Sequence, residues 1–104
     1  MMREYVRVCC TDEISEGEPR CFELPDGNRI AVFRLGDDFY ATSDKCTHGN
    51  ASLSDGWQEK DVIECPFHGG SFNIKTGKAV NFPCIEPVRT YDVKLKGDAL
   101  LIAV

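Results

Sequence analysis

Short runs of apolar and β-branched residues, separated by turn signals, recur along the whole chain. The pattern predicts strands at residues 5–10, 20–24, 29–35, 38–42, 62–65, 71–74, 90–95 and 100–104. The breaks between them are rich in Gly, Pro, Asp and Asn, which accept turn geometry. No segment has the periodicity of a long amphipathic helix. We therefore expect an antiparallel all-β domain.

Two stretches do not fit a strand pattern and are predicted to be ordered loops. Residues 43–56 are rich in Gly, Ser, Thr and Asp, and residues 81–87 contain Pro83 and Pro87. A chain of 104 residues with 42% hydrophobic content has the size of one domain with a modest core. The sequence therefore predicts a single domain over residues 1–104.

Charge and hydropathy exclude some classes of partner and indicate the cellular compartment. The net charge of −5 argues against nucleic acid or an anionic membrane, because both select clustered Lys and Arg. No run approaches the ~20 apolar residues of a membrane span, and the first residues lack the apolar segment of an export signal. We expect a cytoplasmic protein, in which six cysteines indicate thiols or metal ligands more than disulfides.

The only two histidines of the chain each follow a cysteine at short range. One pair is Cys46 and His48, the other is Cys65 and His68, and 16 residues separate His48 from Cys65. Each pair can deliver one sulfur and one nitrogen to a common centre, and neighbouring glycines allow tight turns around it. A lone cysteine or histidine is more often an ordinary packed residue, but two such pairs together favour a metal site. Structural zinc is the alternative, although zinc sites usually pair like ligands.

The two pairs lie in motifs that resemble the Rieske signature, CTHG at 46–49 and CPFHG at 65–69. The resemblance extends along nearly the whole chain, to the small Rieske ferredoxins of bacterial aromatic-ring-hydroxylating dioxygenase systems. The further segments that carry it are residues 39–42, 53–56, 71–72 and 76–78.

The resemblance implies the Rieske iron–sulfur fold, which has three antiparallel β-sheets. A cluster-binding lobe of roughly residues 42–84 would be inserted into a basal lobe formed by residues 1–41 and 85–104. One [2Fe–2S] cluster would be bound, as both cofactor and metal centre. Its implied ligands are Cys46 and Cys65 on the inner iron, with His48 and His68 on the outer iron.

The resemblance also implies a low reduction potential within the Rieske class. Respiratory-chain Rieske proteins carry an additional cysteine in each loop, where this chain has Ala51 and Phe67. They place Ser and Tyr hydroxyls near the cluster sulfurs, where this chain has Gly70 and Phe72. Fewer donors to sulfur favour the oxidised state.

The implied function is electron transfer without catalysis by the chain itself. With both histidines on iron no Ser-His-Asp set remains, and no phosphate-binding loop is present. The resemblance implies a monomeric carrier between a flavoprotein ferredoxin reductase that uses NAD(P)H and a terminal ring-hydroxylating oxygenase. The alternative is a small subunit bound permanently to a redox enzyme such as assimilatory nitrite reductase.

The remaining cysteines and aromatic residues are given ordinary roles. Cys9, Cys10, Cys21 and Cys84 have no ligand-spaced partner and are predicted to be thiols, with Cys9 and Cys10 on opposite faces of one strand. Cys84 lies in a Phe-Pro-Cys segment that resembles the loop covering the cluster in the family, where packing is the expected role. A final group of aromatics is predicted to be core rather than a relay or binding platform: Trp57, Phe67, Phe72 and Phe82.

Overall fold

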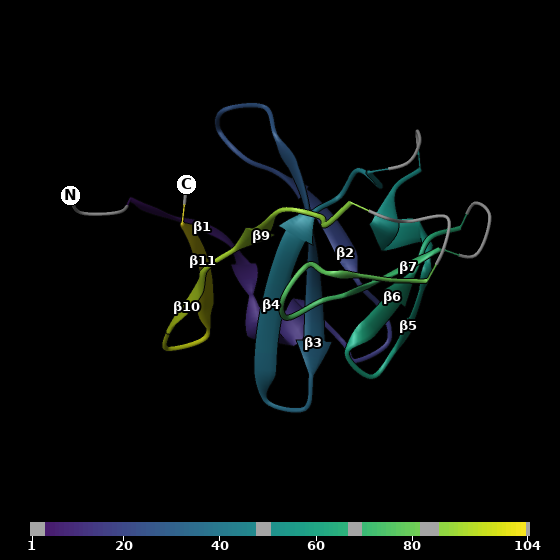
Figure 1. The fold of residues 1–104 in the computed structure, drawn as a ribbon. Helices are drawn as coiled ribbons and strands as arrows, with labels where there is room; N and C mark the ends of the chain where they lie inside the picture. Colours follow the sequence, from purple (N-terminus) through teal and green to yellow (C-terminus); the bar gives the residue numbers. More distant parts are fainter. Residues whose placement is uncertain (1–3, 48–50, 67–69, 82–85, 104) are drawn as a thin grey trace.

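The computed structural model describes residues 4–47, 51–66, 70–81 and 86–103 and measures 37 × 29 × 19 Å. Three antiparallel sheets lie side by side, as Figure 1 shows. The first has the order β1-β11-β10, with β1 Tyr5–Cys10, β10 Val93–Lys96 and β11 Ala99–Ala103. The second has the order β2-β3-β4-β9, with β2 Arg20–Glu23, β3 Arg29–Leu35, β4 Asp38–Ser43 and β9 Thr90–Tyr91. The third has the order β5-β6-β7-β8, with β5 Trp57–Glu59, β6 Val62–Glu64, β7 Ser71–Asn73 and β8 Ala79–Asn81.

Strand β3 lies between two hydrophobic cores. Successive side chains of a strand point to opposite faces, and here Ile30 and Val32 enter one core while Ala31 and Phe33 enter the other. All four side chains are fully buried. The apolar run of this strand therefore joins the first sheet to the third.

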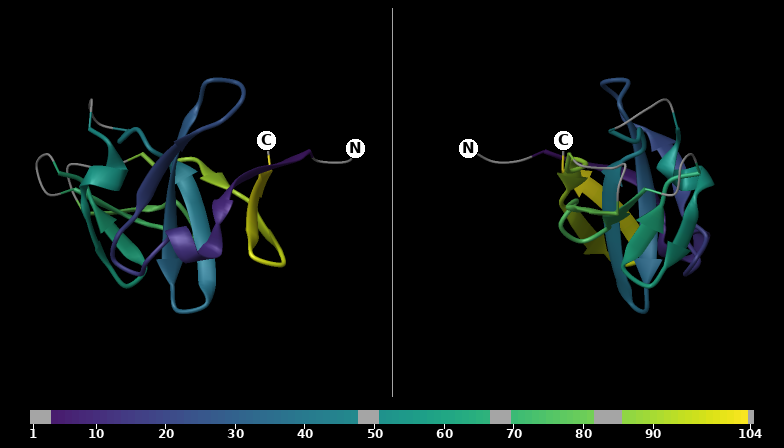
Figure 2. Two further views of the ribbon diagram at one scale, coloured as in Figure 1. Left: turned by 180° about the vertical axis from the view of Figure 1, so that it is seen from behind. Right: turned by 45° about the vertical axis from the view of Figure 1, so that its right-hand side comes forward.

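The core on the side of the third sheet contains both predicted sulfur ligands and is called the cysteine core below. Its buried members are Ala31, Phe33, Cys46, Ala51, Leu53, Ile63, Cys65, Phe72, Ile74 and Val88. The other core is called the basal core, and its buried members are Cys9, Ile14, Leu24, Ile30, Val32, Ala41, Leu100 and Ile102. Figure 2 shows from two further sides that the third sheet stands at the end of the molecule away from both termini.

Two hairpins contain the turn residues that the sequence predicts. Gly36 and Asp37 connect the paired residues Leu35 and Asp38, and Gly97 occupies the same place in the β10–β11 hairpin. Both glycines have positive φ, +63° and +61°, which two-residue hairpin turns require and side-chain-bearing residues rarely adopt.

The all-β prediction is confirmed, and its errors are local. Strands β5 and β8 were not predicted, and the predicted strand 90–95 is divided at Asp92 into β9 and β10, which belong to different sheets. Two 3-10 helices, η1 Thr11–Glu13 and η2 Leu53–Asp55, are the helical elements of the described residues. Within this described part, no helix has the length and hydropathy of a membrane span.

The aromatic prediction is confirmed at one position and wrong at another. Phe72 is fully buried in the cysteine core. Trp57 is 63% exposed because it lies on the outer face of the edge strand β5. Phe67 and Phe82 lie outside the described residues.

Candidate metal centre

The first predicted ligand pair lies in a loop that is closed at its base. Cys46 is 1% exposed, and its backbone N–H donates to the Ala51 carbonyl at 2.9 Å. Next to this bond, Lys45 and Ser52 form a β-bridge. These contacts close a loop between residues 46 and 51, and His48 lies within this loop in the sequence.

The second ligand pair lies in a loop of the same construction. Cys65 follows β6, and its backbone N–H donates to the Gly70 carbonyl at 2.7 Å. Beside this bond, Glu64 and Ser71 form the last residue pair between β6 and β7. The chain therefore again closes a loop, with His68 between its ends.

These two loops correspond residue for residue at their bases. In each, a buried cysteine donates its N–H to the carbonyl five residues later, and the histidine comes two or three residues after the cysteine. Both cysteines belong to the cysteine core, although 19 positions separate them in sequence. Figure 1 shows the described ends of both loops at the same end of the molecule.

Asp44 anchors the first loop to its surroundings. Its carboxylate accepts from the Ser54 N–H at 2.9 Å, and its backbone carbonyl accepts from the Leu53 N–H at 2.6 Å. Its own N–H donates to the Arg29 carbonyl at 3.0 Å. A residue 2% exposed is thereby bonded to β3 on one side and to η2 on the other, which fixes the chain just before Cys46.

The same loop is also tied to the chain that returns to the second sheet. The Thr47 hydroxyl donates to the Glu86 carbonyl at 3.0 Å, and the Ser43 N–H donates to the Arg89 carbonyl at 2.8 Å. These bonds span about forty residues of sequence, so the first loop is held by tertiary contacts as well as by its own closure.

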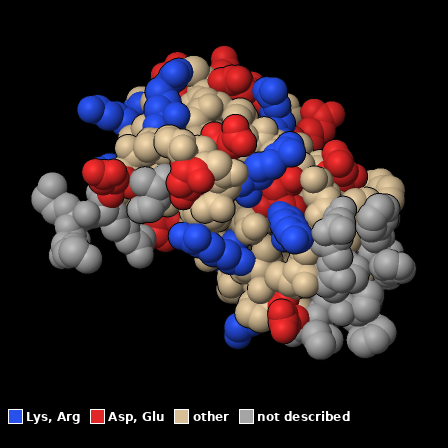
Figure 3. All heavy atoms as spheres, turned by 90° about the horizontal axis from the view of Figure 1, so that it is seen from above, with Lys and Arg blue, Asp and Glu red and all other residues tan. Residues whose placement is uncertain are grey.

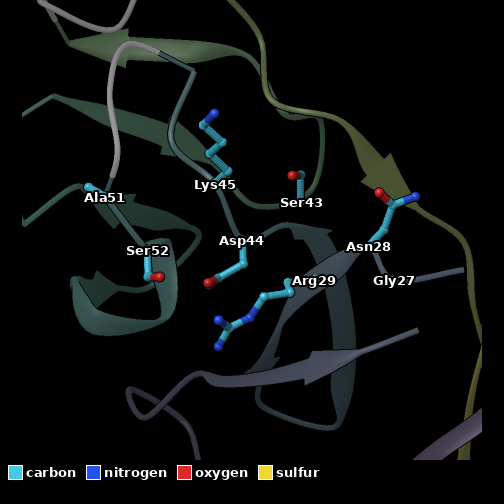
Figure 4. Close-up of a pocket in the computed structure, with 8 residues that line it drawn as sticks. All are labelled: Gly27, Asn28, Arg29, Ser43, Asp44, Lys45, Ala51 and Ser52. Carbon is cyan, nitrogen blue, oxygen red and sulfur yellow. The ribbon is translucent and has the colours of Figure 1, made fainter. Parts of the chain in front are cut away.

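A cavity of about 490 Å³ lies beside the first loop (Figure 4). In it the Asp44 carboxylate points toward the Arg29 guanidinium. The Arg29 Nε–H donates to Cys21 Sγ at 3.3 Å. This bond, followed by the charges of Cys21 and Asp44, raises the pKa of Arg29, while burial is the main cause that raises the pKa of the Cys21 thiol. The Arg29 guanidinium is thus bonded to Cys21 of β2, and the Asp44 carboxylate is bonded to the Ser54 N–H, which indicates that both side chains support the first loop.

The donor set agrees with an iron–sulfur cluster as far as the structure describes it. Two thiols are buried in one core, and each opens a loop that contains a histidine. Sulfur from buried cysteines combined with imidazole nitrogen is the Rieske ligand chemistry. The described residues, which exclude both histidines, contain no cluster of three or more His, Cys, Asp or Glu. The positions of His48 and His68 therefore remain a prediction from the sequence.

The other described cysteines lie in the basal part of the fold. Cys9 is buried in the basal core while its neighbour Cys10 is half-buried, so their predicted opposite orientation is confirmed. Burial raises the pKa of the Cys9 thiol to about 11, and the negative charge of Glu13 contributes. Cys10 Sγ accepts from the Arg7 guanidinium at 2.9 Å. Cys84 lies outside the described residues.

Sequence reasoning missed two residues that position the chain beside Cys46 and Cys65. Asp44 was part of a loop prediction with no role, although an aspartate before a turn is a common backbone acceptor. Gly56 lies in segment 53–56, which carries the family resemblance, and was predicted to have no role of its own. A Cβ at Gly56 would overlap the carbonyl oxygen of Glu64, the residue before Cys65. Only the three-dimensional contact reveals that this position requires glycine.

Comparison with known proteins gives one consistent family. Residues 4–92 match the family model of the Rieske [2Fe-2S] domain. The chain is 43% identical over 103 residues to the ferredoxin CarAc of Metapseudomonas resinovorans, covering 99% of this chain and 96% of that protein.

Solved structures lead to the same group. A ferredoxin of Sphingomonas yanoikuyae B1 superposes with a TM-score of 0.93 at 40% identity, covering 97% of this chain and 99% of that one. The ferredoxin in a complex of reduced oxygenase and oxidized ferredoxin of carbazole 1,9a-dioxygenase gives a TM-score of 0.91 at 42% identity, covering 98% and 94%. With its paired cysteine loops and its three-sheet fold, the chain belongs to the Rieske [2Fe–2S] family and is a ferredoxin of that family.

Proposed function

We propose that this ferredoxin takes one electron from an NAD(P)H-dependent flavoprotein reductase and delivers it to a terminal Rieske non-heme iron oxygenase that hydroxylates aromatic rings. The observation that carries the proposal is the pair of matching loops, each opened by a buried cysteine and each containing a histidine. Similar ferredoxins named as components of dioxygenase systems support it.

The four proposed ligands divide into two chemical types with different tasks. Cys46 and Cys65, which lie in the cysteine core, would hold one iron as thiolates, and His48 and His68 would hold the other through neutral imidazole. When bound, the [2Fe–2S] cluster supplies one-electron redox chemistry, at potentials that span ~−150 to +300 mV in the Rieske class. Replacing two thiolates by imidazoles removes negative charge, which makes the added electron easier to accept.

A carrier of single electrons must dock and leave repeatedly, because a dioxygenase consumes two electrons in each turnover. Weak, transient contacts suit this task better than a permanent interface. We therefore propose a monomer. A partner reductase that uses NAD(P)H supports a place in the cytoplasm.

Electron transfer to an oxygenase tests the function. The chain is reduced, mixed in stopped flow with the terminal oxygenase of the carbazole 1,9a-dioxygenase system, and followed by visible absorption. We expect the ferredoxin to be reoxidised and the oxygenase Rieske centre to be reduced in proportion. A reduced chain that passes no electrons to the oxygenase would contradict the proposed function.

Alanine variants of the histidines test the ligand set independently of any partner. His48→Ala and His68→Ala should each lose the cluster, as shown by iron and sulfide content. Cys21→Ala, which removes a cysteine of the second sheet, should keep it. A full cluster in either histidine variant would remove that residue from the ligand set.

A further inference from the structure

The outer face of the third sheet carries an exposed tryptophan that pairs with Glu64, the residue before Cys65. Trp57 on β5 is 63% exposed, the largest exposure among the large apolar side chains of the described residues. Its cross-strand partner is Glu64, which is paired in turn with Ser71, and Ser71 with Asn81. These four residues form one row across the sheet, since directly paired residues share a face.

A bulge in β8 brings a second apolar side chain to this face. Ser71 pairs with Asn81 while Phe72 pairs with Ala79, so Val80 is the additional residue between them. Val80 is 50% exposed and lines the same depression of about 430 Å³ as Trp57. The Asn81 amide donates to the Ser71 hydroxyl at 3.0 Å and holds the bulged strand in place.

Charge on the rim of this depression has mainly one sign. Three carboxylates line it, from Glu59, Asp61 and Glu64, against the single ammonium of Lys60. On the face drawn in Figure 3, by comparison, acidic and basic side chains are interspersed. A partner surface that fits the depression therefore combines an apolar side chain with flanking lysine or arginine.

The row also leads directly to Cys65, a proposed cluster ligand. Glu64 is followed by Cys65, whose N–H closes the second loop, so a partner covering this row lies against the base of that loop. An aromatic side chain in an acidic rim, next to a loop that holds a proposed cluster ligand, is the arrangement expected of a transient docking surface.

We propose that the Trp57 face, defined as Trp57, Glu59, Glu64, Val80 and Asn81, is a docking surface for the terminal oxygenase. The inference rests on the proposed function and assigns one of its partners to one side of the fold. The oxygenase is chosen because a ferredoxin 42% identical to this chain forms a solved complex with its oxygenase.

Trp57→Ala tests the apolar part of the surface. Because the side chain is largely exposed, the fold and the visible spectrum of the cluster should be unchanged. The Kd of the chain for the carbazole 1,9a-dioxygenase oxygenase should rise about fivefold or more, and Trp57→Tyr should restore most of the affinity. The matched control is Leu95→Ala, which removes an exposed apolar side chain from β10 in the first sheet.

Charge reversal tests the rim. Glu59→Lys should slow electron transfer to the oxygenase about threefold to tenfold at low ionic strength, and the difference should shrink as salt is added. Glu18→Lys, an equal change at an exposed position outside the Trp57 face, is the control.

The results of these experiments distinguish failure of the proposed docking surface from failure of the proposed function. Wild-type chain that transfers no electrons to the oxygenase would overturn both. Normal transfer by the wild type, with Trp57→Ala and Glu59→Lys no different from their controls, would overturn the docking surface alone. Variants that slow reduction by a flavoprotein reductase but not delivery to the oxygenase would also overturn it, since the face would then belong to the other partner.

Discussion

Phe72 is the residue whose environment bears most directly on the reduction potential. It is fully buried in the cysteine core, which also contains Cys46 and Cys65. Respiratory-chain Rieske proteins place a tyrosine hydroxyl near the cluster sulfurs, whereas phenylalanine at this position offers no hydrogen-bond donor. Because this donor is absent, we expect the cluster to have a low reduction potential within the Rieske class.

Phe72→Tyr should therefore raise the reduction potential by roughly 40 mV. The added hydroxyl can donate to a sulfur, and the bond is stronger in the reduced state; ~1 kcal/mol of difference corresponds to this shift at ~59 mV per tenfold change for one electron. Protein-film voltammetry measures it, with Phe22→Tyr beside the basal core as control. A shift within about 10 mV of zero, with the cluster intact, would show that residue 72 does not face the sulfurs.

Cys9 gives the fold a predictable response to alkaline pH. Its pKa is raised from 9.0 to about 11, chiefly by burial. Between these values the unfolded state releases the thiol proton first, so the free energy of unfolding should fall as pH rises from about 9 to 11. The loss should be ~1–2 kcal/mol.

Urea unfolding of the holoprotein at several pH values measures this slope. Cys9→Ala should be less stable overall, because it removes a buried side chain, but its stability should fall less steeply across the same window. Equal slopes for the wild type and Cys9→Ala would assign the alkaline loss of stability to other groups.

At the scale of elements, the junction between η2 and β5 is held by a close backbone contact. Gly56 has an ordinary φ of −85°, so an alanine there would meet no backbone strain. Its Cβ would nevertheless overlap the Glu64 carbonyl oxygen. Strand β6 must move to admit a side chain, and Cys65 lies at the end of that strand.

Gly56→Ala should cost ~2–3 kcal/mol of stability and lower the cluster content of purified protein. The comparison is Gly97→Ala, where φ is +61° and nothing lies within 4 Å of the added Cβ. That change should cost ~1 kcal/mol through conformation alone and leave cluster content unchanged. Thermal unfolding with iron analysis measures both; equal cluster content in the two variants would contradict a positioning role for Gly56.

The elements also show which parts of the fold the sequence predicts. Longer strands such as β1, β3 and β11 have enough alternating or apolar residues to be recognised. Strands β5 and β8 have three residues each, too few for a pattern, and β8 contains a bulge that interrupts alternation. Trp57 was assigned to the core because most tryptophans are buried, and only its place on an edge strand shows otherwise.

Part of the candidate site can likewise be predicted from the sequence, and part cannot. Spacing alone identifies the two cysteine–histidine pairs, because both histidines of the chain lie in them. The contacts that hold those pairs in place do not follow from spacing, because Asp44 is bonded to Arg29 of β3 and Thr47 to Glu86, 39 positions away. Such contacts depend on the finished fold.

At the scale of the whole molecule, the third sheet is attached to the second sheet by side-chain packing and by the segments that connect the two sheets. Ala31 and Phe33 of β3 and Val88 of the returning chain complete the cysteine core from the basal side. The two cysteine loops therefore rest on a core to which the second sheet contributes, and a sheet of three-residue strands could not form this core alone. Assembly of the centre and folding of the whole domain should accordingly be coupled.

The central claim is that one [2Fe–2S] cluster is held by Cys46, Cys65, His48 and His68. Pulsed EPR of the reduced protein, prepared with isotopically labelled histidine, tests it most directly because nitrogen bound to iron couples to the unpaired electron. We expect two coupled histidine nitrogens and the low average g-value of a Rieske centre, and the loss of this signal in His48→Ala and His68→Ala. A cluster without coupled histidine nitrogen, or protein that contains zinc and no iron, would contradict the account.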